Sequence, residues 1–482
     1  MADERTSQSG LRQRIARLPL AVRLLLLAAL IAVGVWASKW LMLIFLVALG
    51  LWPITLALGL VTLAVVSIWH GGWPWMKEWL STRLRGLVIP ALSVLTALII
   101  GGLVLFFTDQ QVYEALREGG LFEAIKVGVG NLLKAYGALY EGALGNPAEI
   151  LKAIPETIGG EEGLKPLLKV VRGPSDSLVQ SVPYIFAGLA VALGFRAGLF
   201  NIGAEGQIGI GWLAAVFVGY SITGLPAFIH LPLAILVGAG AAGLWASIAG
   251  ILKARTGAHE VITTIMLNYV VYRLSEWLLC GPMEKTVGTC RTQEIAATAF
   301  LPRFLEHPVS IHWGFVLALV AAALTGWFLF RTTWGFELRT VGANPDAARY
   351  SGMSVGKAFV LAMFLSGCLA GLAGVVQGLG ISHNIALGFQ AGYGFDAIAL
   401  ALLGKSHPAG VVAASLLFGG LRAGAARMQS VAGIPTEIVQ IVQALVIVFI
   451  AAPPIIRTIY HLRKPREEAA EVSVFSRGWG AQ

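Results

Sequence analysis

Charged side chains are scarce in this sequence. Asp, Glu, Lys and Arg make up only 13% of its 482 residues, while 57% are hydrophobic. Soluble domains typically carry about 25% charged residues. A soluble fold has too little interior for so many apolar side chains, so the composition excludes an ordinary soluble domain. It predicts an all-α polytopic membrane protein with the lipid bilayer as its solvent.

Cysteines are also few, at three. Cys368 lies in an apolar run and is expected to be a packing residue, whereas Cys280 and Cys290 lie ten positions apart in a polar segment predicted to be external. In an oxidising compartment these two thiols can form a disulfide. Two free thiols are an equal alternative, and the sequence leaves the choice open.

Motifs for catalysis are lacking. Gly404-Lys405-Ser406 resembles the end of a phosphate-binding loop, but Ala399 stands where that motif needs a glycine. The glycine pattern beginning at Gly209 lies inside an apolar run, and neither a zinc-protease nor a serine-hydrolase motif is present. The chain is therefore not expected to be an enzyme or to hold a cofactor or metal. If ATP drives it, ATP and magnesium belong to a partner subunit.

Apolar runs divide the chain, and a helix needs about 20 apolar residues to cross a bilayer. The runs 391–404 and 408–424 are short, and are expected to be broken or re-entrant pieces, which are tolerated only inside protein or along a cavity. About 10–12 transmembrane helices are predicted. The runs lie at 20–38, 41–69, 87–107, 178–195, 205–222, 230–252, 259–279, 311–330, 357–380, 391–404, 408–424 and 436–456.

The net charge of +9 is distributed at the ends of these runs. That distribution is typical of the positive-inside pattern and not of a nucleic-acid surface, so no nucleic-acid partner is expected. Basic residues place both termini and the loop 331–357 in the cytoplasm. The segment 108–177 has seven Lys/Arg against ten Asp/Glu and is expected outside. We predict a multi-pass protein of a bacterial inner membrane.

The segment 108–177 also carries apolar residues at helical spacing, with charges between them. Either it lies on the outer membrane face, which the pattern favours, or it helps to receive a partner. The apolar residues are Phe122, Ile125, Leu132, Leu133, Tyr136 and Leu139.

A polar stretch separates two apolar runs at 195–207. Arg196, Asn201, Glu205 and Gln207 lie there beside Phe195. Charged residues at membrane depth usually face a cavity or one another, which would make this stretch a lining or gate on a solute path. The alternative is a cytoplasmic turn in which Arg196 is a positive-inside anchor, and the sequence does not decide between them.

Other polar residues inside the apolar runs complete a candidate solute path. Each has the alternative of a hydrogen bond between helices. A path for a polar solute needs hydrogen-bonding groups and an apolar or aromatic wall. The candidate path residues are Phe195, Asn201, Glu205, Gln207, Asn268, Gln377, Phe395 and Asp396.

The basic loop 331–357 contains signals for a short helix. Asn344 suits a helix cap and Pro345 the first helical position, Asp346 favours the positive helix end, and Gly352 suits termination. An ordinary linker is not expected to carry so many helix start and stop signals. We interpret the segment as a docking element that lies outside the membrane.

The polar stretch 195–207 and the loop segment 331–353 resemble permeases of ABC importers of the branched-chain amino acid, ribose and nucleoside class. The stretch 195–207 and the run Gly394-Phe395-Asp396-Ala397-Ile398-Ala399 are most similar to the nucleoside branch. The resemblance implies a permease that pairs with a second permease, docks ATPase subunits and receives its solute from an external binding protein. Alternating access would then move a small polar solute, with a nucleoside favoured. The coupling helix to the ATPase would comprise Gly342, Asn344, Pro345, Asp346, Ala347, Ala348, Arg349 and Tyr350.

Two other functions compete with this one. A self-sufficient secondary transporter driven by an ion gradient would use buried carboxylates such as Glu205 and Asp396. An intramembrane enzyme is disfavoured, because no nucleophile–base or metal constellation is found in the sequence.

The expected organisation has four parts. The family resemblance covers roughly one of them, residues 178–456. Residues 1–107 form a cytoplasmic tail and extra transmembrane helices, and 108–177 form an external amphipathic loop. Residues 178–456 form the permease core, and 457–482 a cytoplasmic tail. The part before residue 178 exceeds what the family core requires.

Overall fold

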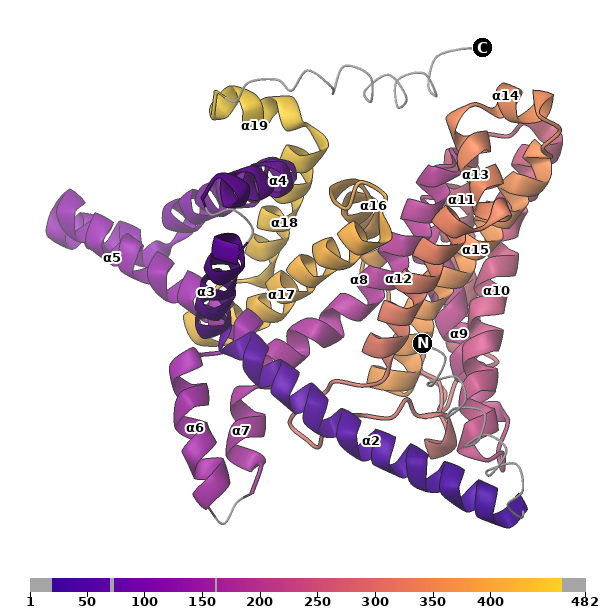
Figure 1. Ribbon diagram of the computed structural model, residues 1–482, viewed down its shortest axis with the longest axis horizontal. Helices are drawn as coiled ribbons and strands as arrows, with labels where there is room; N and C mark the ends of the chain where they lie inside the picture. The colour runs from indigo at the N-terminus through magenta and orange to yellow at the C-terminus, as the bar shows by residue number, and fades with distance from the viewer. Residues whose placement is uncertain (1–19, 70–72, 161–162, 462–482) are drawn as a thin grey trace.

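The computed structural model in Figure 1 describes residues 20–69, 73–160 and 163–461. Within these ranges the chain is helical and contains no strand; two isolated bridges pair Arg291 with Ala386 and Arg303 with His312. The predicted tail before residue 20, and most of the predicted tail 457–482, lie outside the described residues. The prediction of an all-α polytopic protein is confirmed.

The helices begin and end as follows: α2 (Leu20–Gly50), α3 (Trp52–Trp69), α4 (Trp73–Thr108), α5 (Gln110–Leu144), α6 (Pro147–Gly159), α7 (Lys165–Val170), α8 (Arg172–Arg196), α9 (Ala204–Ser221), α10 (Ala227–Thr256), α11 (Glu260–Leu279), η1 (Ala297–Ala299), α12 (Gly314–Arg331), α13 (Thr333–Ala343), α14 (Pro345–Tyr350), α15 (Val355–Gln377), η2 (Gly378–Ser382), α16 (Tyr393–Leu403), α17 (Pro408–Ala432), α18 (Thr436–Ala451) and α19 (Pro453–Ile459).

Six of the described helices are long and apolar enough to cross a membrane, or up to eight spans if each bent pair counts as one. One bent pair joins α2 to α3 at 85°, so the runs 20–38 and 41–69 divide near residue 51 and not near residue 40. This criterion gives fewer spans than there are apolar runs. One reason is that α16 has only 11 residues; another is that α11 carries Glu260, Arg273 and Glu276.

One expectation about short segments was wrong. The run 408–424 belongs to α17, which has 25 residues and is long enough to span. The short piece is α16 alone, and the irregular segment 383–392 precedes it. Thus α15 and η2 lead away from α14, and the chain returns through 383–392 and α16.

The N-terminal third forms helices of its own. Figure 1 shows α3, α4 and α5 beside α17, α18 and α19, while α9 to α15 gather on the other side; α5 packs on α17, and α4 packs on α18. The helix predicted in 108–177 is present as part of α5. Its predicted apolar residues divide: Leu132 and Leu139 are partly buried against the core, whereas Phe122 is 80% exposed and Leu133 68% exposed. Small residues such as Ala135 and Ala138 are buried beside them.

The centre of the bundle is closely packed around α15. A Cβ at Gly371 would overlap Ala242 of α10, and a Cβ at Gly374 would overlap the backbone of Ile208 in α9. Only glycine lets the backbones approach this closely. This packing holds α9, α10 and α15 together as the frame against which α8 and α16 are placed.

The bundle has two ends. The "α14 end" comprises the end of α8, helices α13 and α14, the α10–α11 turn, and the turn Gly404–His407 between α16 and α17. The "disulfide end" comprises the segment 280–313 and the start of the irregular segment 383–392.

Candidate functional site

Glu205 lies buried in the first turn of α9, only 4% exposed. Its two carboxylate oxygens accept hydrogen bonds from the backbone N–H groups of Gly392 (3.0 Å) and Gly394 (2.6 Å), at the start of α16. A Cβ at Gly394 would overlap the backbone of Glu205, so glycine is required there. Glu205 therefore fixes the entry of α16 inside the bundle.

One turn further along α16, a second polar cluster involves two other helices. The Tyr184 hydroxyl of α8 donates to Asp396 Oδ2 at 2.9 Å. Arg422 of α17 donates from Nη1 to the Tyr184 oxygen at 2.9 Å. The Arg422 guanidinium also lies 4.4 Å from the ring centre of Tyr393, within cation–π range. A carboxylate and a guanidinium thus share one tyrosine.

Two amides extend this cluster. Gln377 Nε2 donates to the Tyr393 hydroxyl at 2.9 Å, and that hydroxyl donates to Gln180 Oε1 at 3.2 Å. Tyr184 and Tyr393 meet edge to face, with 5.0 Å between ring centres. We call Gln180, Tyr184, Gln377, Tyr393, Asp396 and Arg422 the "α16 cluster".

The α16 cluster lies at mid-depth in the bundle. Tyr184 precedes the end of α8 at Arg196 by 12 residues, which is about 18 Å along a helix. Asp396, Arg422 and Gln180 are all partly exposed, and Phe395 next to them is 47% exposed. Ionisable groups at this depth face a water-filled cavity or another polar surface, because lipid contact is costly.

Three other predicted path residues form a separate network that is fully buried. Asn201 and Gln207 exchange hydrogen bonds at 2.9 and 3.0 Å, and Asn201 also donates to Ser366. Asn268 accepts from the Gly206 N–H at 2.9 Å and donates to the Ile202 carbonyl at 3.0 Å. These amides are therefore engaged in holding the turn between α8 and α9.

The structure thus divides the eight predicted path residues. Glu205, Gln377, Phe395 and Asp396 gather at the start of α16. Asn201, Gln207 and Asn268 form the buried network, and Phe195 packs on Phe200 near the α14 end. Sequence reasoning missed Arg422, Tyr184 and Gln180. A lone arginine in an apolar helix was the available signal for Arg422.

The helix predicted at the α14 end is present. Asn344 caps α14 and accepts from the N–H groups of Asp346 and Ala347, both at 3.0 Å. Asp346 pairs with Arg349 at 3.3 Å, and Tyr350 is 96% exposed. Ala348 is fully buried against the chain's own core, so it offers no surface to a partner. The sequence had assigned it to the docking element because six residues are too few to reveal a buried face.

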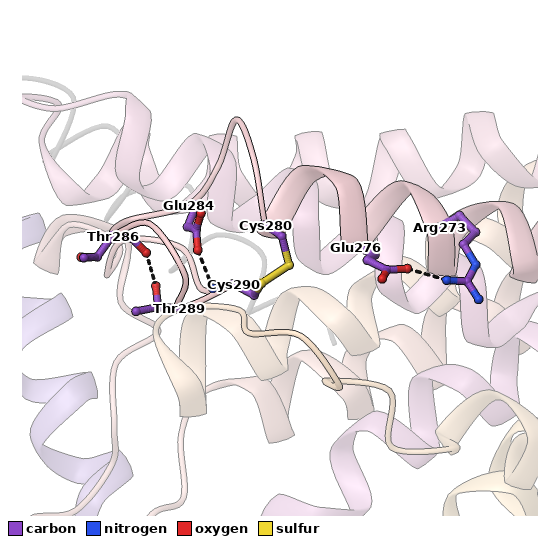
Figure 2. Close-up of a disulfide and its surroundings, with 7 residues drawn as sticks. All are labelled: Arg273, Glu276, Cys280, Glu284, Thr286, Thr289 and Cys290. Carbon is purple, nitrogen blue, oxygen red and sulfur yellow. Dashed lines mark hydrogen bonds and ion pairs between the residues drawn. A yellow bond between two sulfur atoms is a disulfide. The ribbon is translucent and has the colours of Figure 1, made fainter.

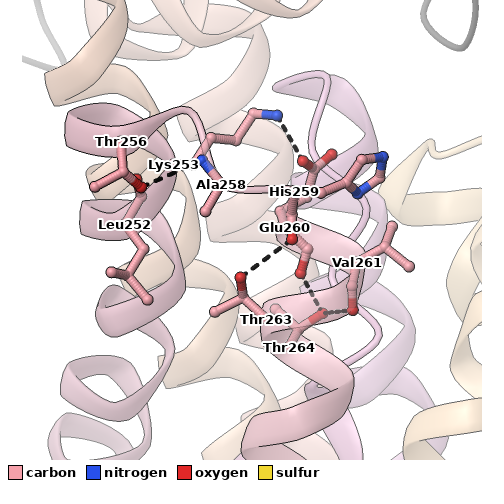
Figure 3. Close-up of polar contacts among 9 residues, drawn as sticks. All are labelled: Leu252, Lys253, Thr256, Ala258, His259, Glu260, Val261, Thr263 and Thr264. Carbon is pink, nitrogen blue, oxygen red and sulfur yellow. Dashed lines mark hydrogen bonds and ion pairs between the residues drawn. The ribbon is translucent and has the colours of Figure 1, made fainter.

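At the same end, an ion pair closes the turn between α10 and α11. Lys253 Nζ lies 2.5 Å from Glu260 Oε2, and both side chains are mostly buried. Figure 3 shows this pair with the hydrogen bonds of Thr263 and Thr264 that begin α11. The pair fixes α10 against α11 away from α16.

The disulfide end contains the bond between Cys280 and Cys290 that the sequence left open (Figure 2). Beyond the disulfide, Leu387 N–H donates to the Cys290 carbonyl at 3.0 Å, and Thr292 N–H donates to the Ile385 carbonyl at 3.0 Å. Because residues 385 and 387 belong to the irregular segment that leads into α16, the disulfide-closed loop anchors that segment.

Comparison with known proteins now identifies the chain's family. Residues 173–451 match the family described as "Branched-chain amino acid transport system / permease component". This chain belongs to that permease family. The match begins at the start of α8 and ends at the end of α18, so it contains both the α16 cluster and α14.

Similar proteins agree with this assignment. The guanosine ABC transporter permease protein NupP of Bacillus subtilis is 45% identical over 286 residues, 58% of this chain and 82% of that protein. The nucleoside permease protein NupB of Lactococcus lactis is 35% identical over 311 residues, 63% of this chain and 84% of that protein. The glucose ABC transporter permease protein TsgB13 of Haloferax volcanii is 38% identical over 288 residues, which are 58% of this chain and 76% of that protein. No solved structure matches this chain.

The family defines the general function. The chain is a multi-pass membrane permease subunit of an ATP-driven ABC importer, as the resemblance implied. Importers of this kind work with ATPase and solute-binding proteins, so the hydrolysis of ATP belongs to a partner.

Proposed function

We propose that this permease translocates nucleosides. Two of the similar permeases named above are a guanosine and a nucleoside permease. The α16 cluster supports the proposal because it combines hydrogen-bonding groups with aromatic rings. A ribose offers hydroxyls to groups such as Asp396 and Gln180, and a base offers a flat face to a ring such as Phe395. The observation that carries the proposal is the pair Asp396 and Arg422, both partly exposed at mid-depth and joined through the buried Tyr184.

Translocation is proposed to follow alternating access. A second permease subunit covers the partly exposed face of α8, α16 and α17, and an external binding protein delivers the solute at the disulfide end. ATP and magnesium bind in the ATPase subunits, and this chain contributes no cofactor. The α14 end and both termini lie in the cytoplasm of a bacterial cell, in accordance with the positive-inside pattern.

The ATPase is proposed to dock on the exposed face of α14. Asp346, Ala347, Arg349 and Tyr350 are exposed there, with the side chains of Asp346 and Arg349 90% and 71% exposed. Replacing Tyr350 with Glu should release the ATPase from the purified complex without altering the thermal stability of the permease. If the ATPase remains bound to this variant and uptake is normal, α14 is not the docking helix.

Uptake into proteoliposomes tests the solute. The complete complex should accumulate labelled guanosine or adenosine only when ATP is present on the side of the membrane where the ATPase lies. Excess unlabelled nucleoside should reduce the uptake of label. Asp396→Asn should raise the half-saturating nucleoside concentration. Competition by glucose and not by nucleosides would make the chain a sugar permease, as the name of the Haloferax volcanii relative suggests. Uptake that needs an ion gradient and no ATP would instead support the secondary transporter.

A further inference from the structure

Arg196 is the last residue of α8, and its side chain holds the turn that ends α16. Arg196 Nε donates to the Ser406 carbonyl at 3.0 Å, and Nη2 donates to the Lys405 carbonyl at 3.1 Å. The planar guanidinium fork suits two neighbouring acceptors, which a lysine ammonium cannot match with the same geometry. The turn needs such support, because Lys405 and Ser406 both have left-handed φ angles (52° and 50°). Such angles are unfavourable for residues other than glycine.

An aromatic contact strengthens the same junction. His407, in the same turn, stacks on Phe330 near the end of α12, with 5.4 Å between ring centres. The guanidinium carbons of Arg196 and Arg339 lie 5.8 and 5.2 Å from the centre of the Phe330 ring. The end of α8, the end of α12 and helix α13 therefore meet at the turn after α16.

The backbone of the same α8 end lies directly against α13. A Cβ at Gly342 would overlap the Arg196 carbonyl oxygen, and a Cβ at Gly198 would lie 2.9 Å from Gly342 Cα. Gly342 is in the last turn of α13, and only Asn344, the shared cap residue, separates α13 from α14. A displacement of α14 is therefore transmitted through Gly342 to Arg196.

The opposite end of α16 enters the candidate solute site. α16 has 11 residues, about 16 Å of helix. Its first residues supply the N–H of Gly394 to Glu205, and they supply Asp396 to Tyr184. Because a short α-helix moves as a rigid rod, a shift of the turn at Lys405 is carried to these contacts.

We propose that Arg196 is the positioning residue that links docking at α14 to the solute site at the start of α16. The contacts run from α14 through Gly342 to the end of α8, then through the Arg196 guanidinium to the turn Gly404–His407, and along α16 to Glu205 and Asp396. The inference rests on the proposed function in one respect, namely that the ATPase docks on α14.

A simpler role for Arg196 is a positive-inside anchor in contact with lipid phosphates. The geometry argues against it, because Arg196 is partly buried and two of its donors are directed at protein carbonyls. An anchor needs only positive charge, so lysine would replace it fully. A positioning role needs the guanidinium fork that donates to two carbonyls, so lysine would not replace arginine fully.

The test measures coupling in the complete transporter in proteoliposomes, with Arg196→Lys and Arg196→Gln. Contiguous contacts count as a coupling pathway only if a change at one point alters the response at another. We expect both variants to assemble with the ATPase and to keep basal ATP hydrolysis within about twofold. Loss of two charge-assisted hydrogen bonds should reduce solute transported per ATP hydrolysed by roughly tenfold or more in Arg196→Gln, and by less in Arg196→Lys.

A matched control comes from the same end of the bundle. Lys253→Ala removes a mostly buried ion pair that lies away from α16, so it should lower thermal stability while leaving the ratio of solute to ATP unchanged. If Arg196→Gln is too unstable to purify, the comparison of Arg196→Lys with Lys253→Ala decides alone. A double variant with Gly342→Ala adds a second check. Residues on one pathway should give non-additive losses of coupling.

Three results would overturn the proposal: an unchanged ratio of solute to ATP in Arg196→Lys and Arg196→Gln, full function of Arg196→Lys, or strictly additive losses in the double variant. Failure of the proposed function gives a different result. If solute-loaded binding protein does not stimulate ATP hydrolysis in the wild-type complex, the proposed docking of the ATPase and the proposed transport are refuted, whatever the Arg196 variants do.

Discussion

Removing Arg422 should destabilise the bundle because it leaves Asp396 without a nearby cation. In Arg422→Met the volume is approximately kept, while the 2.9 Å hydrogen bond to Tyr184 and the 4.4 Å contact with the Tyr393 ring are lost. A hydrogen bond to a charged group is worth about 1.5–3 kcal/mol. A partly desolvated cation–π contact is worth about 1 kcal/mol. Because Arg422 is only partly buried, we expect a loss of about 2–4 kcal/mol in the free energy of unfolding.

The assay is denaturant unfolding of the purified permease in detergent, with Arg422→Met, Asp396→Asn and the double variant. Asp396→Asn should cost less than Arg422→Met, because Arg422 keeps its hydrogen bond to Tyr184 and its contact with the Tyr393 ring, and the amide oxygen can still accept from the Tyr184 hydroxyl. In the double variant, part of the loss should be recovered, since the neutral amide no longer needs a cation. The argument is refuted if Arg422→Met is as stable as the wild type, or if the double variant loses the full sum of the two single losses.

Three further predictions concern the disulfide end and the start of α16. Cys280→Ser combined with Cys290→Ser should cost about 3 kcal/mol from loop entropy and increase protease cleavage in residues 383–392, because the anchored segment is released; unchanged cleavage would contradict this. At the disulfide end, the pKa of His312 is lowered from 6.5 to about 4, mainly by burial and then by Arg303 and His383. Its Nδ1 must stay deprotonated to accept a hydrogen bond from the Gly314 N–H. Since the folded state binds this proton less tightly than the unfolded state, stability should be fully present above pH 6.5. It should decrease by roughly 3 kcal/mol as the pH falls to 4, and His312→Gln should flatten that part of a melting-temperature profile. Gly394→Ala should cost about 1–3 kcal/mol and impair uptake, because its Cβ overlaps the Glu205 backbone. The control Gly420→Ala, in α17, should have a neutral or stabilising effect in the same assays, because its Cβ would make only ordinary contacts with Ala143 and Ser177.

Sequence reasoning succeeded where the cause is local. The cap at Asn344 and the end of its helix near Gly352 depend on neighbouring residues, so the short helix could be predicted from residue types alone. Apolar runs likewise predicted most of the long helices. Hydrophobicity does not mark where they bend. The bend of α2 against α3 at Leu51 is instead indicated by Pro53, which predicts a kink in the run 41–69.

The composition of the site could not be predicted in the same way. Tyr184, Asp396 and Arg422 come from three helices, and more than 200 sequence positions separate Tyr184 from each of the other two. Each residue alone is compatible with lipid-interface, interhelical or cavity positions, and only tertiary packing chooses. The same limit applies to Ala348: whether an alanine in a helix of one and a half turns is buried depends on the helices it meets.

The two polar networks differ in a property that matters for transport. Asn201, Gln207 and Asn268 are at most 2% exposed and donate to, or accept from, groups of their own chain. A solute could reach them only by breaking those bonds in a dry interior, at a cost of the order of 1–3 kcal/mol for each group left unpaired. Asp396, Arg422 and Gln180 are partly exposed, so a solute can exchange with water there while their contacts with Tyr184 and Tyr393 persist. The proposed solute path therefore runs along the α16 cluster and not through the buried amides. The buried amides instead hold the turn before α9, and Glu205 anchors the start of α16 to α9.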